Sequence, residues 1–75
     1  MEIYKDLDAD SGVSAFQNGR DFIRVKFKDG SIYRYTYAST GQSHIEHMKS
    51  LAIAGDGLNS YINRYVRKAY EAREA

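Results

Sequence analysis

The chain has 75 residues and no cysteine, so it has room for one small domain without disulfide bonds or thiolate metal ligands. Apolar residues make up 43% and charged residues 28%, a balance typical of a folded domain rather than a disordered one. No apolar run approaches the ~20 residues of a membrane span, and the first ten residues lack the apolar stretch of a signal peptide. These features predict a cytoplasmic protein that does not associate with membranes.

Charge is unevenly distributed, although the net charge is only +1. Residues 1–10 carry four acidic side chains and one lysine, whereas the rest of the chain carries ten Lys or Arg and six Asp or Glu. We therefore expect residues 1–12 to form a loosely ordered acidic leader and residues 13–75 to form the single domain. A mildly basic domain is a modest indication of an anionic partner.

Three short segments have the alternating pattern of β-strands. They begin at Val13, Asp21 and Ser31, and an Asn-Gly and an Asp-Gly dipeptide separate them. Both dipeptides favour tight turns between antiparallel strands. The pattern therefore predicts a three-stranded antiparallel meander.

The Asp29-Gly30 turn decides which side chains share a face of this sheet. A two-residue loop would place Val25 opposite Arg34 and mix apolar with charged side chains on both faces. A three-residue loop with Gly30 in the left-handed region places Val25 opposite Tyr33 instead. We predict the second register, because it alone gathers the apolar and aromatic side chains on one face. That face would comprise Ile23, Val25, Phe27, Tyr33, Tyr35 and Tyr37.

Two helical segments follow and are expected to cover the apolar face, which gives an α+β fold of order β-β-β-α-α. The first helix is expected to begin with a capping box from Ser43 to Glu46, with Thr40 as an alternative start, and to end at Gly55. The second is expected to run from about Leu58 to the C-terminal end. The predicted core comprises Ile23, Val25, Phe27, Tyr33, Tyr35, Ile45, Met48, Leu51, Ile62 and Tyr65.

The order of several motifs resembles the KTSC domain, a small module named after the C-termini of some lysyl-tRNA synthetases. The run YRY at 33–35 is similar to the Tyr-x-Tyr centre of that family, and the run YINRYV at 61–66 to its aromatic-aromatic-Asn-basic run. The match extends over roughly residues 11–70, although this chain lacks the proline that often opens the family's first helix. The resemblance implies the family's fold and suggests RNA binding, with no established activity. The family-motif residues, expected to be structural, are Tyr33, Tyr35, Tyr61, Asn63 and Tyr70.

Catalysis and metal binding are not indicated by the sequence. His44 and His47 flank Glu46, but a zinc site needs a third ligand that no other spacing supplies, so we interpret both histidines as solvent-facing. The Gly-Asp-Gly run at 55–57 lacks the Lys and Ser or Thr that complete a phosphate-binding loop. We therefore expect a non-enzymatic protein without a cofactor or a metal.

The charged face of the predicted sheet is the candidate binding surface. The register places Arg24, Lys26 and Arg34 together on the face away from the helices, and we expect no acidic side chain beside them. Phe22 would lie on the same face, where its ring could stack on a base. This arrangement indicates RNA or another nucleic acid, bound through its phosphates. The candidate nucleic-acid-binding residues are Phe22, Arg24, Lys26, Arg34, Arg64, Arg67 and Lys68.

An alternative function stays open from the sequence. The protein could be a protein-interaction module or a small homodimer with no nucleic-acid role. Its contact surface would then be a sheet edge or the apolar margin of the last helix around Val66 and Tyr70.

Overall fold

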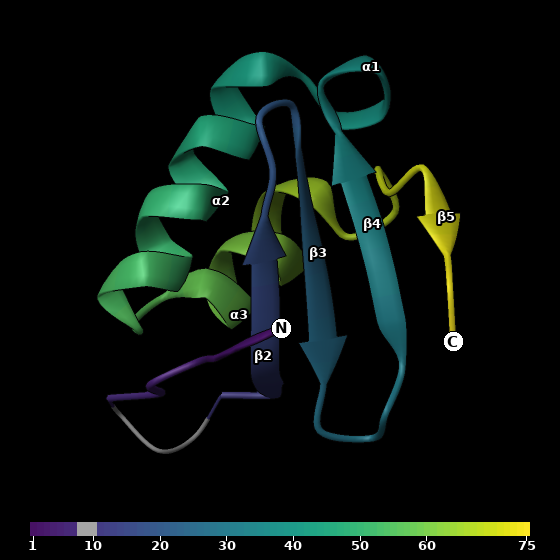
Figure 1. Cartoon of the computed structure of the whole chain (residues 1–75). Coiled ribbons are helices and arrows are strands. Elements are labelled where there is room, and N and C mark those ends of the chain that lie inside the picture. The colour runs from purple at the N-terminus through teal and green to yellow at the C-terminus, as the bar shows by residue number, and fades with distance from the viewer. Residues whose placement is uncertain (8–10) are drawn as a thin grey trace.

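The computed structural model describes residues 1–7 and 11–75, so the middle of the expected leader lies outside the described residues. The fold is α+β with an antiparallel sheet, as predicted, but the sheet has five strands rather than three. The strands lie side by side in chain order: β1 (Glu2–Ile3), β2 (Val13–Asn18), β3 (Phe22–Phe27), β4 (Ile32–Thr36) and β5 (Ala72–Arg73). Helices cover one face of this sheet (Figure 1).

The strand β1 comes from the segment expected to be a loosely ordered leader. In β1, Glu2 lies opposite Phe16 of β2. Just after β1, the backbone N–H of Tyr4 donates to the carbonyl oxygen of Ser14 at 3.0 Å. The Tyr4 side chain is only 4% exposed, and its hydroxyl accepts a hydrogen bond from the backbone N–H of Leu58 at 3.2 Å. The described part of the leader therefore belongs to the sheet and the core, because Tyr4 fills the core and satisfies an N–H group at a helix start.

The predicted register of the β3–β4 hairpin is confirmed. Val25 lies opposite Tyr33, and Ile23 lies opposite Tyr35. Gly30 has a φ of 91°, and its N–H donates to the carbonyl oxygen of Phe27 at 2.9 Å. The left-handed glycine makes the bulge that assigns the apolar side chains to one face and the charged ones to the other.

The first helical region begins earlier than predicted. The helix α1 (Tyr37–Thr40) follows β4 directly, and a capping box joins Thr36 to Ser39. The longer helix α2 (Gln42–Ala54) then begins after Gly41 and has no side-chain cap, so the predicted Ser43–Glu46 capping box is wrong. Thr36 has the extended backbone of the strand end, which lets its hydroxyl accept from the next turn. The predicted end of the helix at Gly55 is confirmed, with a φ of 74°.

The single long C-terminal helix predicted from the pattern is also wrong. The chain instead forms one helical turn, α3 (Leu58–Tyr61), followed by the π-helix η1 (Ile62–Val66), and then turns back to the sheet. The N–H of Glu71 donates to the carbonyl oxygen of Arg34 at 2.7 Å, and β5 pairs with β4. The open edge of β4 offers unpaired backbone groups, and the C-terminal segment satisfies part of them.

The core lies between the sheet and the helices. Most of its predicted members are buried or packed against it, but Tyr65 is 57% exposed and was wrongly assigned. Its neighbour Val66 is buried in its place, since Ile62 and Val66 share the inward side of η1. The buried core comprises Tyr4, Val13, Phe16, Ile23, Val25, Tyr35, Ile45, Met48, Ala52, Leu58, Ile62 and Val66. Among the described residues, no helix is both long and apolar enough to cross a lipid bilayer.

Candidate functional site

The outer face of the sheet, which points away from the helices, carries the cations that the sequence singled out. Arg24 and Arg34 lie directly opposite each other on β3 and β4. The guanidinium of Arg24 donates to Glu74 Oε1 from Nε at 2.9 Å and from Nη2 at 2.6 Å. Arg34 Nε lies 3.3 Å from Glu71 Oε1 and 3.5 Å from Glu74 Oε2. The expectation that no acid lies beside these arginines is therefore wrong, because β5 and its flanking residues bring two carboxylates to them.

The other outer-face candidates offer little contact surface. Lys26 is exposed and forms no ion pair within the described part of the chain. Phe22 is half-buried, and its ring lies against Gly19 so closely that a Cβ on the glycine would be 2.0 Å from a ring carbon. The ring is thus already packed against its own turn. Of the outer-face candidates, Lys26 is the one that remains available to a phosphate.

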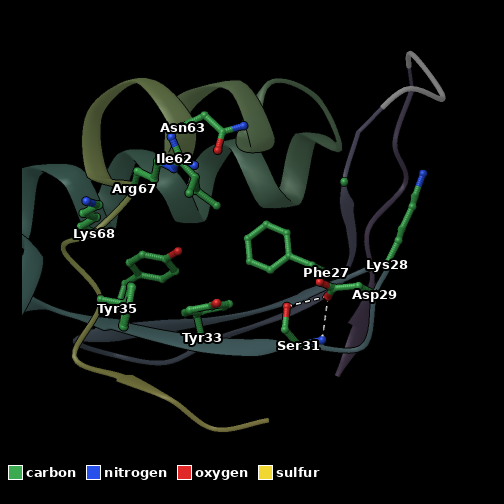
Figure 2. A pocket seen from close by; sticks show the side chains of 12 residues that line it. Phe27, Lys28, Asp29, Ser31, Tyr33, Tyr35, Ile62, Asn63, Arg67 and Lys68 are labelled. Atoms are coloured by element: carbon green, nitrogen blue, oxygen red, sulfur yellow. Dashed lines mark hydrogen bonds between the residues drawn. The ribbon is translucent and has the colours of Figure 1, made fainter.

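A pocket of about 520 Å³ lies on the inner face of the same two strands, beside the β3–β4 hairpin (Figure 2). Its walls are mostly aromatic. The rings of Phe27 and Tyr33 meet edge to face at 5.7 Å, and those of Tyr33 and Tyr70 at 4.7 Å. Tyr35 is only 1% exposed, whereas Phe27 and Tyr33 are half-buried. The helices therefore cover one end of the apolar sheet face and leave its hairpin end partly open.

Unpaired cations stand at the rim of this pocket. Arg67 and Lys68 are exposed, and neither forms an ion pair or a side-chain hydrogen bond with any described residue. Figure 2 shows both on the helical side of the pocket, together with Asn63. A further cation, Arg73, lies over the Tyr33 ring with 5.6 Å between its Cζ and the ring centroid. Positive charge therefore gathers around the aromatic walls.

The hairpin side of the pocket carries one fixed carboxylate. Asp29 Oδ1 accepts hydrogen bonds from the Ser31 hydroxyl at 2.6 Å and from the Ser31 backbone N–H at 2.9 Å (Figure 2). These bonds, with help from the charge of Arg73, hold the pKa of the Asp29 carboxyl below its usual value. Nearby Lys28 is also exposed, but its ammonium is paired with Asp6 at 3.0 Å. Asp29 is thus held ionised and in one orientation.

The apolar interior of the pocket changes the pKa of one of its tyrosines. Burial, followed by the proximity of Tyr33 and Tyr70, raises the pKa of Tyr35 to about 12. Its hydroxyl therefore stays protonated at any physiological pH. The pocket presents a neutral aromatic surface between a cationic rim and a single carboxylate.

Residues of the family motif contribute to the pocket. Four of the five family-motif residues line it: Tyr33, Tyr35, Asn63 and Tyr70. The fifth, Tyr61, lies elsewhere, with its hydroxyl 2.6 Å from His44 Nδ1. Arg64 also lies outside the lining, with its guanidinium 5.6 Å from the centroid of the Tyr65 ring. Sequence reasoning missed Phe27, Asp29 and Ser31 as site residues, and their position at a hairpin end was the only available signal.

The two histidines belong to an aromatic cluster between α2 and the last helical segment. The ring of His47 lies 4.6 Å from that of Tyr61, and Tyr61 lies 4.9 Å from Tyr65. His47 is exposed as expected, whereas His44 is half-buried. Within residues 1–7 and 11–75, no three His, Asp or Glu side chains gather closely enough to hold a metal ion.

The surfaces expected for a protein partner are occupied in part. Val66 is buried, and Tyr70 packs its ring against Tyr33 and Tyr35. The edge of β4 pairs with β5. Val66 and the β4 edge therefore take part in the fold of the domain, whereas Tyr70 remains 37% exposed.

Comparison with known protein families, curated proteins and solved structures finds no match to this chain. The resemblance to the KTSC domain stays a prediction, and the pocket itself carries the functional argument.

Proposed function

We propose that the protein is a small non-enzymatic module that binds single-stranded nucleic acid, expected to be RNA, at the pocket rather than at the outer face of the sheet. The observation that carries this proposal is the pairing of half-buried aromatic rings with unpaired cations. Proteins that bind single strands combine such rings, on which bases stack, with Lys and Arg that contact the backbone.

The size and chemistry of the pocket favour an unpaired strand over a duplex. Its volume of about 520 Å³ lies in the ~300–1,000 Å³ range of small-molecule sites, which is room for one nucleotide. A base within a duplex is stacked on its neighbours and does not enter such a pocket. A single strand can turn one base inward and leave its phosphates at the rim.

The cations at the rim supply the phosphate contacts in this proposal. Arg67 and Lys68 have no acidic partner among the described residues, so a phosphate need not displace an internal ion pair to reach them. On the outer face a phosphate would compete with Glu71 and Glu74 for the arginines. With few contacts in all, we expect weak binding that falls as salt is added. The suggested RNA binding of the KTSC domain agrees with this proposal.

Charge reversal at the rim tests the proposed site. Binding of a fluorescent single-stranded RNA to the Arg67→Glu/Lys68→Glu variant should fall at least tenfold at low salt. The slope of log affinity against log salt should flatten by about two, roughly one for each phosphate that the variant no longer neutralises. Fluorescence anisotropy at two or more salt concentrations measures both quantities.

The matched control changes the net charge equally elsewhere on the molecule. The Arg20→Glu/Lys26→Glu variant reverses two exposed cations that form no ion pair with any described residue. It should keep most of the affinity and of the salt slope. If the two variants lost equal affinity and equal salt slope, the phosphates would not be bound specifically at the pocket rim, and the proposed site would be wrong. If the parent protein binds no RNA at low salt, the proposal fails and sedimentation analysis should test self-association instead.

A further inference from the structure

We propose that the pocket takes one unpaired guanine of the bound strand, with Asp29 accepting hydrogen bonds from the Watson–Crick edge of that base. This inference rests on the proposed function, because it names the base that the strand places in the pocket. Three observations carry it: the aromatic walls, the orientation of the Asp29 carboxylate and the separation of charge across the pocket.

The aromatic walls give a base a surface on which to stack. Phe27 and Tyr33 are both half-buried, so part of each ring faces the pocket. Their rings stand nearly perpendicular, at 82°, which forms a corner between the hairpin and the sheet. A planar base can lie against one ring and meet the other with its edge. Stacking alone accepts any base, so it does not select among them.

Selection comes from the carboxylate at the hairpin. Asp29 Oδ1 accepts both hydrogen bonds from Ser31, while Oδ2 makes no hydrogen bond with any described residue. A carboxylate can only accept, and each of its oxygens has more than one acceptor position. Ser31 is only 6% exposed, whereas Asp29 is exposed and lines the pocket, so the remaining acceptor positions of the carboxylate are accessible to a ligand.

Guanine is the base whose pairing edge matches an acceptor-only group. It presents two neighbouring donors, N1–H and the N2 amino group, to the same side. Adenine and cytosine place a ring-nitrogen acceptor beside their amino group, and uracil flanks its single N–H with two carbonyl oxygens. Each of those acceptor atoms carries a negative partial charge and would be repelled by the carboxylate. Guanine instead donates two hydrogen bonds to it. A fixed carboxylate at the pocket therefore favours guanine.

The charges on the two sides of the pocket orient the nucleotide. Figure 2 shows Asp29 and Ser31 on the hairpin side and Arg67 and Lys68 on the opposite, helical side. The phosphate is attracted to Arg67 and Lys68, whereas Lys28 on the hairpin side is already paired with Asp6. The base edge is thereby directed toward Asp29 and the backbone toward the rim, which sets one direction for the inserted nucleotide.

Labelled heptamers of the form UUUXUUU test the inference, with X as guanine, adenine, uracil or an abasic site. The parent protein should bind the guanine heptamer at least fivefold more tightly than the uracil heptamer, and the abasic heptamer most weakly. Inosine at X, which lacks the N2 amino group, should fall between guanine and uracil. Anisotropy titrations at one low salt concentration give all five affinities.

The Asp29→Asn variant distinguishes recognition from general attraction. The amide keeps an oxygen for the Ser31 hydrogen bonds but replaces the other acceptor with a donor, so the preference for guanine should disappear. Affinity for the uracil heptamer should stay the same or rise. The control is Asp21→Asn, the same change at the opposite end of β3, which should keep the preference.

The outcomes separate the two proposals. Equal affinity for guanine, uracil and abasic heptamers, with salt-dependent binding retained, would overturn the guanine pocket and leave single-strand binding standing. A guanine preference that survives Asp29→Asn would also overturn it. The absence of binding to every heptamer at low salt would instead overturn the proposed function.

Discussion

Cations lie on both sides of the β3–β4 hairpin, and the two arginines on the outer side differ from the cations of the pocket rim in being paired with carboxylates. On the outer face, Arg24 and Arg34 meet Glu71 and Glu74, which the C-terminal segment around β5 supplies. On the inner side, the exposed Arg67 and Lys68 at the pocket rim meet no acid among the described residues and lie beside half-buried rings. The two arginines of the binding surface predicted from the sequence are thus paired with carboxylates of the domain itself.

A cluster of cations is open to a phosphate only where the fold leaves it without acidic partners. Exposed ion pairs contribute only ~0–1 kcal/mol to stability, but they occupy the donors that a phosphate would use. The two arginines would repel each other across the strands, and the two glutamates relieve that repulsion. The rim cations have no such neighbours among the described residues and stay available to a ligand.

Truncating aromatic residues on the inner face should give the largest loss of stability. The loss should be greater at the end that the helices cover than at the open hairpin end. Tyr35→Ala removes a ring that is 1% exposed and should cost about 3–5 kcal/mol of unfolding free energy. Tyr33→Ala removes a half-buried pocket wall and should cost clearly less. Urea unfolding followed by circular dichroism measures both. Equal costs would mean that the hairpin end is as tightly packed as the core.

Substituting the hairpin glycine should give an intermediate effect, because Gly30 sets which side chains lie on each face. A Cβ at Gly30 meets nothing within 4 Å, so Gly30→Ala causes no steric clash with neighbouring side chains. Its expected loss of ~1 kcal/mol of unfolding free energy comes from the φ of 91° alone. Gly41→Ala is the matched control, since Gly41 also has a positive φ and open space around it. Both variants should lose similar stability in urea unfolding, but only Gly30→Ala should weaken RNA binding. An unchanged stability for Gly30→Ala would contradict the bulged turn.

Acid should give the smallest effect, and Glu74 measures it on the outer face. Hydrogen bonding from Arg24 lowers the pKa of the Glu74 carboxyl below its ordinary 4.5. A lowered pKa in the folded state means that the stabilising contribution is fully present above the ordinary pKa and is lost as the pH falls through the lowered one. Glu74→Gln should therefore reduce the urea midpoint slightly at pH 7, and this deficit should shrink as the pH falls below 4.5. A deficit that stays constant as the pH is lowered would show that the pair adds no pH-dependent stability.

The candidate site could be predicted only in part from the sequence. The motif tyrosines, Asn63, Arg67 and Lys68 were all singled out, but the tyrosines were assigned to packing and the cations to an extended patch. Their convergence on one pocket depends on where the helical segment stops relative to the sheet, and η1 ends before it covers Tyr33. Phe27 and Asp29 became site residues for the same reason.

What the sequence determined by itself was local. The alternation of β3 and β4, the left-handed Gly30 and the end of α2 at Gly55 all depend on residues a few positions apart, and each was predicted as it is found. Steric limits on the backbone act on neighbouring residues whatever the rest of the chain does. The division of side chains between the two faces of the hairpin followed from these limits.

Only the tertiary structure decided the edges of the sheet and the neutralisation of its outer face. Tyr4 reaches Leu58, and Glu71 pairs with Arg34, across long stretches of chain. The pattern of residues 58–75 favours a helix, yet its end forms β5 because the edge of β4 offers unsatisfied hydrogen-bonding groups. Such pairings depend on which distant groups the fold brings together, and tertiary contacts of this kind override local propensity.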